Sequence, residues 1–127
     1  MRMWVMDSLE TIYVALYLVG VTAKYVGFFH TSYAVYLSMQ QPERLLLLTK
    51  WLYPDVAKHY HTNCPVVERS IRTAATVAWQ LRPEKLAIMG KCKLYKRPSN
   101  AQFISIILGF LQSSDSEVMQ RALLQIS

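Results

Sequence analysis

Residues 54–79, PDVAKHYHTNCPVVERSIRTAATVAW, decide how this chain folds, because they combine a short helix, a polar turn and a longer helix. This order is the plan of a helix-turn-helix unit. An apolar stripe at helical spacing, which we expect to face inward, is formed by Val67, Ile71, Ala74 and Ala78. The sequence therefore predicts a helix-turn-helix over about residues 54–82.

The opposite side of the longer helix carries residues suited to reading base pairs. An α-helix fits the major groove, where Arg can fork onto O6 and N7 of guanine and Glu can accept from N4 of cytosine. The alternative is a solvated face on which Glu68 and Arg72 pair across one turn, a pair worth only about 0.2–0.5 kcal/mol. We predict base contacts from Glu68, Arg69, Arg72 and Thr73.

Polar and basic residues flank this helix, and such residues position a protein on the DNA backbone without reading sequence. The N-terminus of the helix is itself suited to a phosphate oxygen. One flanking residue, His61, stands in the turn where many helix-turn-helix units have glycine. We predict backbone contacts from Lys58, His61, Thr62, Asn63, Lys96, Arg97 and Ser99.

Charge is concentrated in the middle of the chain. The net charge is +6, but residues 43–97 carry +7 and the remainder carries −1. A basic region of this kind favours a polyanionic partner, and a solvated basic surface is the alternative. Apolar residues make up 53% of the 127 residues, enough for the core of one domain.

Other classes of function find little support in the sequence. His59, His61 and Cys64 lack an evident fourth ligand for a structural zinc, and no spacing of Ser, His and Asp indicates an enzyme. We expect no metal and no cofactor. The apolar run of residues 12–23 is too short to span a bilayer. With two widely separated cysteines, we expect a cytoplasmic, nucleoid-associated protein and no membrane partner.

The pattern along the chain predicts an all-α, compact bundle of about six helices within residues 1–113. Asp7 and Glu10 are typical of a helix N-terminus, and Gly20 follows that helix. Ser99 and Gln102 form a second capping pair, and Gly90 is expected to close the helix that precedes the basic loop. The expected helices cover about 8–18, 22–40, 42–52, 54–61, 65–82, 84–89 and 99–112, with the basic loop at 91–98 and a tail of residues 114–127 that could form a short helix.

The runs YPDVAKHYHT and VERSIRTAATVAW resemble the C-terminal DNA-binding effector domain of the sporulation-initiation response regulator family. The resemblance covers about residues 8–112, including GVTAKYVGFFHTSYAVYL and the stretch 93–104. It implies sequence-specific binding to short G- and C-containing DNA boxes, often as dimers on tandem sites. It also implies base-reading roles for Glu68, Arg69 and Arg72. The family's usual Ser-Arg before VER is replaced here by Pro65-Val66, and its His after IR by Thr73.

Two questions of organisation follow from this resemblance. Full-length members carry an N-terminal receiver domain, for which 127 residues leave no room. We therefore expect a free-standing paralogue, with an excised domain as the alternative. The rival function is a protein-interaction module that pairs with a full-length regulator without reading DNA, supported by Pro65-Val66 and the apolar tail residues Val118, Met119, Leu123 and Leu124. For the tail we weigh weak self-association against docking on its own domain or disorder.

Overall fold

The computed structural model describes residues 9–113, and this part of the chain is entirely helical with its connecting turns. The predicted capping residue Asp7 and the predicted tail helix lie outside the described residues. The elements are α1 (Leu9–Leu18), α2 (Val26–Gln40), a 3-10 helix η2 (Pro42–Leu46), a π-helical turn η3 (Leu48–Leu52), α3 (Tyr53–His59), α4 (Cys64–Leu81), α5 (Pro83–Gly90) and α6 (Asn100–Gln112). The prediction of an all-α, compact bundle of about six helices is confirmed, since residues 9–113 form six α-helices.

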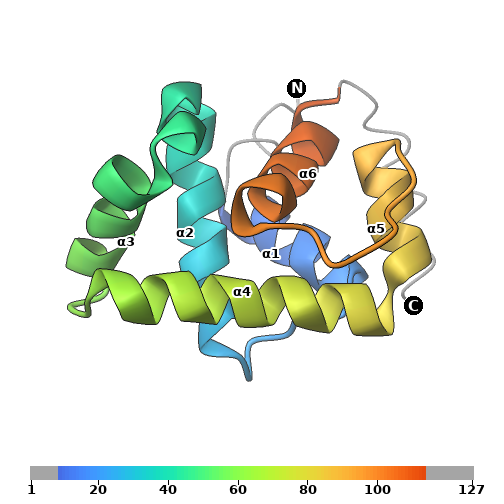
Figure 1. Ribbon diagram of the computed structural model, residues 1–127, viewed down its shortest axis with the longest axis horizontal. Helices are drawn as coiled ribbons and strands as arrows, with labels where there is room; N and C mark the ends of the chain where they lie inside the picture. Colours follow the sequence, from blue (N-terminus) through green and yellow to red (C-terminus); the bar gives the residue numbers. More distant parts are fainter. Residues whose placement is uncertain (1–8, 114–127) are drawn as a thin grey trace.

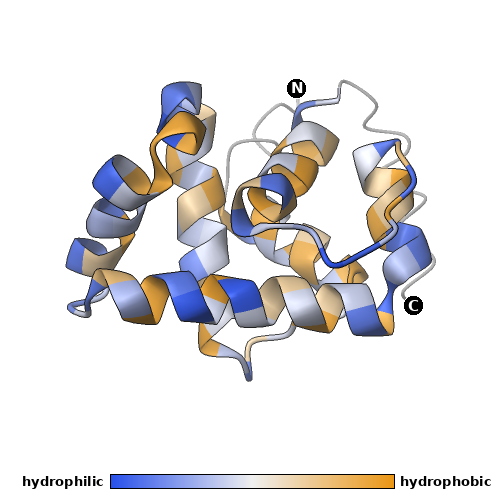
Figure 2. Cartoon of the chain, in the orientation of Figure 1, coloured by the Kyte–Doolittle hydropathy of each residue, from blue (hydrophilic) through white to orange (hydrophobic). Residues whose placement is uncertain are grey.

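Helix α4 is the longest helix and runs across one side of the bundle, from α3 at one end to α5 at the other (Figure 1). Helices α2 and α6 pack against α4, and α1 packs against α2 and α6. Between these four helices lies a core in which Ile12, Leu16, Ile71, Phe103 and Ile107 are fully buried. Figure 2 shows the hydrophilic residues of α4 on the side that faces away from this core. The bundle therefore presents one face of α4 to solvent.

The second helix begins at Val26, four residues later than the sequence predicted. The preceding residues form a turn in which the Tyr25 N–H donates to Thr22 O at 3.1 Å. Val21 is fully buried in this connection. The chain between α1 and α2 is therefore held by a buried side chain and a turn hydrogen bond before the helix begins.

The predicted single helix over residues 42–52 is wrong. The chain forms η2, changes direction at Leu47 (φ −136°, ψ 61°), and then passes through η3 directly into α3. The four consecutive leucines explain the break, because they cannot all face the core. Leu46 and Leu47 remain 82% and 48% exposed. An ion pair between Arg44 and Asp55 ties η2 to α3 across this change of direction.

Helix α5 also ends differently from the prediction. Gly90 is its last helical residue, and Lys91 instead takes the left-handed conformation that follows the helix, with φ 54°. Gly90 is needed for another reason. A Cβ built on it would lie 3.1 Å from Ile106 Cγ1, so the absence of a side chain lets α5 approach α6.

The turn between α3 and α4 agrees with the predicted helix-turn-helix. Asn63 caps α4, since its Oδ1 accepts from the Val66 N–H at 3.0 Å, and Pro65 occupies the first helical turn. His61 has φ 55°, the left-handed conformation that glycine adopts most readily. The expectation of glycine at this place in the turn therefore has a direct physical basis.

Helix α2 packs against the middle of α4 at Gly27. A Cβ built on Gly27 would lie 2.1 Å from Ser70 O and 3.2 Å from Ala74 Cβ. Backbone therefore meets backbone here, and any larger residue must push the two helices apart.

We predict that His61→Gly stabilises the protein by about 0.5–1 kcal/mol, the left-handed penalty less the greater entropy of glycine in the unfolded chain. Urea unfolding followed by circular dichroism measures this change. Lys58→Gly is the control, because Lys58 is exposed within α3 and glycine there should cost about 1 kcal/mol. A loss of stability in His61→Gly would contradict the left-handed conformation given for His61.

Two glycine-to-alanine substitutions should act in opposite directions. Gly27→Ala should destabilise the protein by about 1–3 kcal/mol, because α2 and α4 must separate. Gly109→Ala, in α6, meets no atom within 4 Å and should stabilise by about 0.5–1 kcal/mol. Thermal unfolding of the pair measures both effects. An equal change in the midpoint of thermal unfolding for the two variants would show that α2 and α4 are not in close contact at Gly27.

Candidate nucleic-acid interface

The exposed face of α4 holds the predicted base-reading residues. Arg69, Arg72 and Thr73 are exposed and Glu68 is partly exposed. Behind them, the predicted apolar stripe of Val67, Ile71, Ala74 and Ala78 is fully buried, so its inward orientation is confirmed. Since α4 follows a short helix and a tight turn, it occupies the place of the recognition helix in a helix-turn-helix.

The side chains of Glu68 and Arg72 are paired with each other. Arg72 Nη2 donates to Glu68 Oε1 at 2.7 Å, and the two side chains are 49% and 40% exposed. An exposed pair one turn apart contributes only about 0.3–0.5 kcal/mol. Exchanging it for contacts with bases therefore costs little.

The hydroxyl of Thr73 is used within the helix. Its Oγ1 donates to Arg69 O at 3.0 Å, and Thr76 makes the same kind of bond to Arg72 O. Thr73 therefore presents a methyl group and an acceptor oxygen outward, not a donor. Thymine methyl groups and base amino groups are the features of the major groove that suit such a surface.

The N-terminus of α4 has few N–H groups to offer a phosphate. Pro65 has none, the Val66 N–H donates to Asn63 Oδ1, and the Val67 N–H donates to Asn63 O at 3.1 Å. Cys64 carries the remaining N–H of the first turn. The first turn of α4 therefore has few free N–H groups that could bind a phosphate oxygen.

Most of the predicted backbone-contacting residues lie on the surface, on α3, in the turn before α4 and in the loop before α6. Lys58 is exposed on α3, and His61 and Asn63 are exposed in the turn. In the basic loop (residues 91–98), Lys96 is exposed, whereas Arg97 is partly buried and its Nη1 donates to Pro98 O at 3.3 Å. Ser99 caps α6 by accepting from the Gln102 N–H at 3.1 Å, as predicted.

Two polar contacts that tie α4 to its neighbours were not predicted. Asn100, the first residue of α6, donates from Nδ2 to Tyr53 OH and to Glu68 O, each at 3.0 Å. On the other side of α4, Ser70 Oγ lies 2.6 Å from His30 Nδ1 and donates to Val67 O at 3.0 Å. The one sign of these contacts in the sequence was Ser70, a hydroxyl at a position of such helices that is often apolar.

Burial keeps the groups in these contacts uncharged. It lowers the pKa of His30 below its usual value, so the ring is neutral at pH 7. The neutral ring and the Ser70 hydroxyl share one hydrogen bond, between His30 Nδ1 and Ser70 Oγ. Burial likewise raises the pKa of Tyr53, so its hydroxyl stays protonated.

Other features of the surface do not join this site. Among residues 9–113, no group of three or more His, Cys, Asp or Glu could hold a metal ion. The His59 ring instead stacks on Tyr33 with the ring centroids 3.9 Å apart. Within the same residues, no helix has the length and apolar character needed to cross a membrane.

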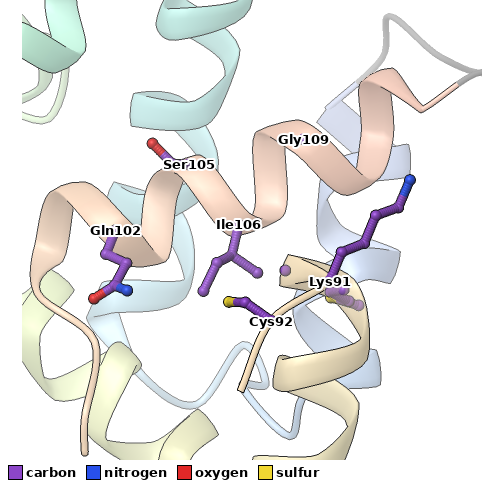
Figure 3. A pocket seen from close by; sticks show the side chains of 8 residues that line it. Lys91, Cys92, Gln102, Ser105, Ile106 and Gly109 are labelled. Carbon is purple, nitrogen blue, oxygen red and sulfur yellow. The ribbon is translucent and has the colours of Figure 1, made fainter. Parts of the chain in front are cut away.

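A pocket of about 320 Å³ lies between the end of α5 and α6 (Figure 3). Ile106 points into it, and Lys91 and Cys92 border it. It shares no residue with the predicted DNA contacts. Its lining consists of Met89, Gly90, Lys91, Cys92, Gln102, Ser105, Ile106 and Gly109.

Comparison with known protein families gives this surface its context. The family described as "Sporulation initiation factor Spo0A C terminal" matches residues 12–111, which is most of the chain. The six-helix bundle is consistent with that domain. The chain therefore belongs to the family of C-terminal effector domains of Spo0A-type sporulation regulators, which are DNA-binding transcription factor domains and not enzymes.

Proposed function

We propose that this protein is a sequence-specific transcription regulator that places α4 in the major groove of a short, G- and C-containing DNA box. One observation carries this proposal. Arg69 and Arg72 are both exposed, on the side of α4 opposite to its fully buried apolar stripe. Two guanidinium groups at this spacing can each fork onto a guanine. Glu68, released from Arg72, can accept from a cytosine on the complementary strand.

Contacts to phosphates frame these base contacts. The turn residues His61, Thr62 and Asn63 lie at the N-terminal end of α4, and Lys58 lies on the helix before it. Lys96, Arg97 and Ser99 lie at the end of the basic loop, directly before α6, whose first residue Asn100 is bonded to α4. A helix held by phosphate contacts from more than one element keeps its register along the groove.

The same proposal covers assembly and location. Tandem boxes would seat two copies of the chain, and a two-fold dimer is the commonest arrangement of identical chains. A duplex DNA partner places the protein at the nucleoid in the cytoplasm. Sedimentation of the full chain with a one-box and a two-box duplex distinguishes a single bound copy from a pair.

The experiment that tests the proposal compares duplexes. Fluorescence anisotropy measures binding to a G/C-containing box and to its scrambled sequence, at two salt concentrations. The protein must bind the G/C-containing box more tightly than the scrambled sequence at both salt concentrations. Equal affinity for the two duplexes, or no binding to either, would overturn sequence-specific reading and point to a module that binds protein instead.

We predict that Arg69→Ala and Arg72→Ala each weaken binding to the box by about 1–3 kcal/mol and relax the preference for guanine. Binding to scrambled DNA should change less. The matched control is Arg82→Ala, which removes the same charge just after the end of α4. If all three variants lose affinity equally, charge alone and not base reading explains the loss.

We predict a different signature for the basic loop. Replacing Lys96 and Arg97 by Ala should weaken binding to the box and to scrambled DNA alike. It should also reduce the slope of log affinity against log salt by about one unit for each lost contact, because fewer counterions are released. A slope like that of the wild-type protein would show that this loop lies away from the DNA.

A further inference from the structure

Asn100 links three helices from a buried position. It is 8% exposed and is the first residue of α6. Its side-chain nitrogen has two hydrogens, one for Tyr53 OH at the start of α3 and one for Glu68 O in α4, both at 3.0 Å. The side-chain donors of Asn100 are therefore fully used in holding both helices of the helix-turn-helix to α6.

The acceptor in α4 lies in the turn that carries the base-reading side chains. Glu68 O is a main-chain atom of the turn from Glu68 to Arg72, on which Arg69 also stands. A bond to this atom constrains the backbone of the turn while leaving the outward side chains unhindered. The contact thus fixes where α6 begins relative to the residues that would read bases.

The basic loop ends immediately before Asn100. Pro98 is buried and Ser99 caps α6, so the last part of the loop is anchored to the helix. Lys96 precedes Asn100 by four residues, which limits the separation of their Cα atoms to about 14 Å. The position of Asn100 therefore limits where the cations of the loop can lie beside α4.

We propose that Asn100 is a positioning residue that couples the phosphate contacts of Lys96 and Arg97 to the base contacts of α4. This rests on the proposed function. With Asn100 in place, the loop and the Glu68–Arg72 turn meet the duplex in one fixed register. Without its amide, α6 stays packed through Phe103 and Ile107, which are fully buried, but the loop loses its register with α4.

The test uses the full chain and a thermodynamic cycle. Asn100→Leu keeps the approximate volume of the side chain, removes its donors and adds no charge. Gln102→Leu is the matched control, an amide on the same helix whose side chain is exposed. Each variant is combined with the replacement of Lys96 and Arg97 by Ala. Affinity for box and scrambled duplexes is then measured over a range of salt, at a temperature where circular dichroism shows the protein folded.

We expect Asn100→Leu to lower affinity for the box by about tenfold, about 1.4 kcal/mol, because the loop and α4 no longer meet the duplex in one register. The salt slope should fall by about one unit although no charge has been removed. In this background, replacing Lys96 and Arg97 should have little further effect. Gln102→Leu should leave both measurements unchanged and the loop substitutions fully effective.

Independent, additive effects of the Asn100 and loop substitutions would overturn the proposal, as would an unchanged salt slope. If Asn100→Leu does not fold, Tyr53→Phe removes one acceptor and must still reduce the slope. A wild-type protein that does not distinguish box from scrambled DNA refutes the proposed function, and this inference falls with it. A specific wild type with an unchanged Asn100→Leu slope refutes this inference alone.

Discussion

The contact between Gly27 and Ser70 is the constraint on which the rest of the interface depends. Because glycine has no side chain, α2 lies against the backbone of α4, where an added Cβ would come within 2.1 Å of Ser70 O. One turn along α2, His30 reaches Ser70 Oγ at 2.6 Å. Since α2 is itself packed in the bundle, these contacts fix the rotation of α4. That rotation decides that Arg69 and Thr73 face solvent and Ile71 faces the core.

Asn100 constrains the same helix at Glu68, two residues before Ser70, because its amide donates to Glu68 O. The backbone between Glu68 and Arg72 is thus held by the Asn100 amide and by α2, which packs closely at Gly27 and contacts Ser70 through His30. The side chains of Arg69 and Arg72 remain exposed. A backbone fixed before binding loses little conformational entropy on binding, so more of the contact energy contributes to affinity.

Local chemistry explains which parts of this fold could be predicted from sequence. The start of α4 was predicted within one residue, because Asn63 and Pro65 act on their own neighbours. The structure of residues 42–52 was not predicted correctly. The break at Leu47 depends on which leucines are buried in the core and on the Arg44–Asp55 ion pair. The hydrogen bonds of Asn100 and His30 were not predicted, because their partners lie 32 to 47 residues away in the chain. Sequence patterns predicted which residues of α4 face outward, but they did not predict the contacts that fix the orientation of the helix.

The start of α4 also shows how this chain differs from the family pattern it resembles. Pro65 and Val66 replace a hydroxyl and a positive charge, and Asn63 occupies the N–H groups of Val66 and Val67. Little remains at this end of the helix to hold a phosphate. In the proposed complex, charged contacts to phosphate would come from Lys58 on α3 and Lys96 at the end of the basic loop. Such contacts require the loop to keep a fixed position relative to α4, which is the role proposed for Asn100.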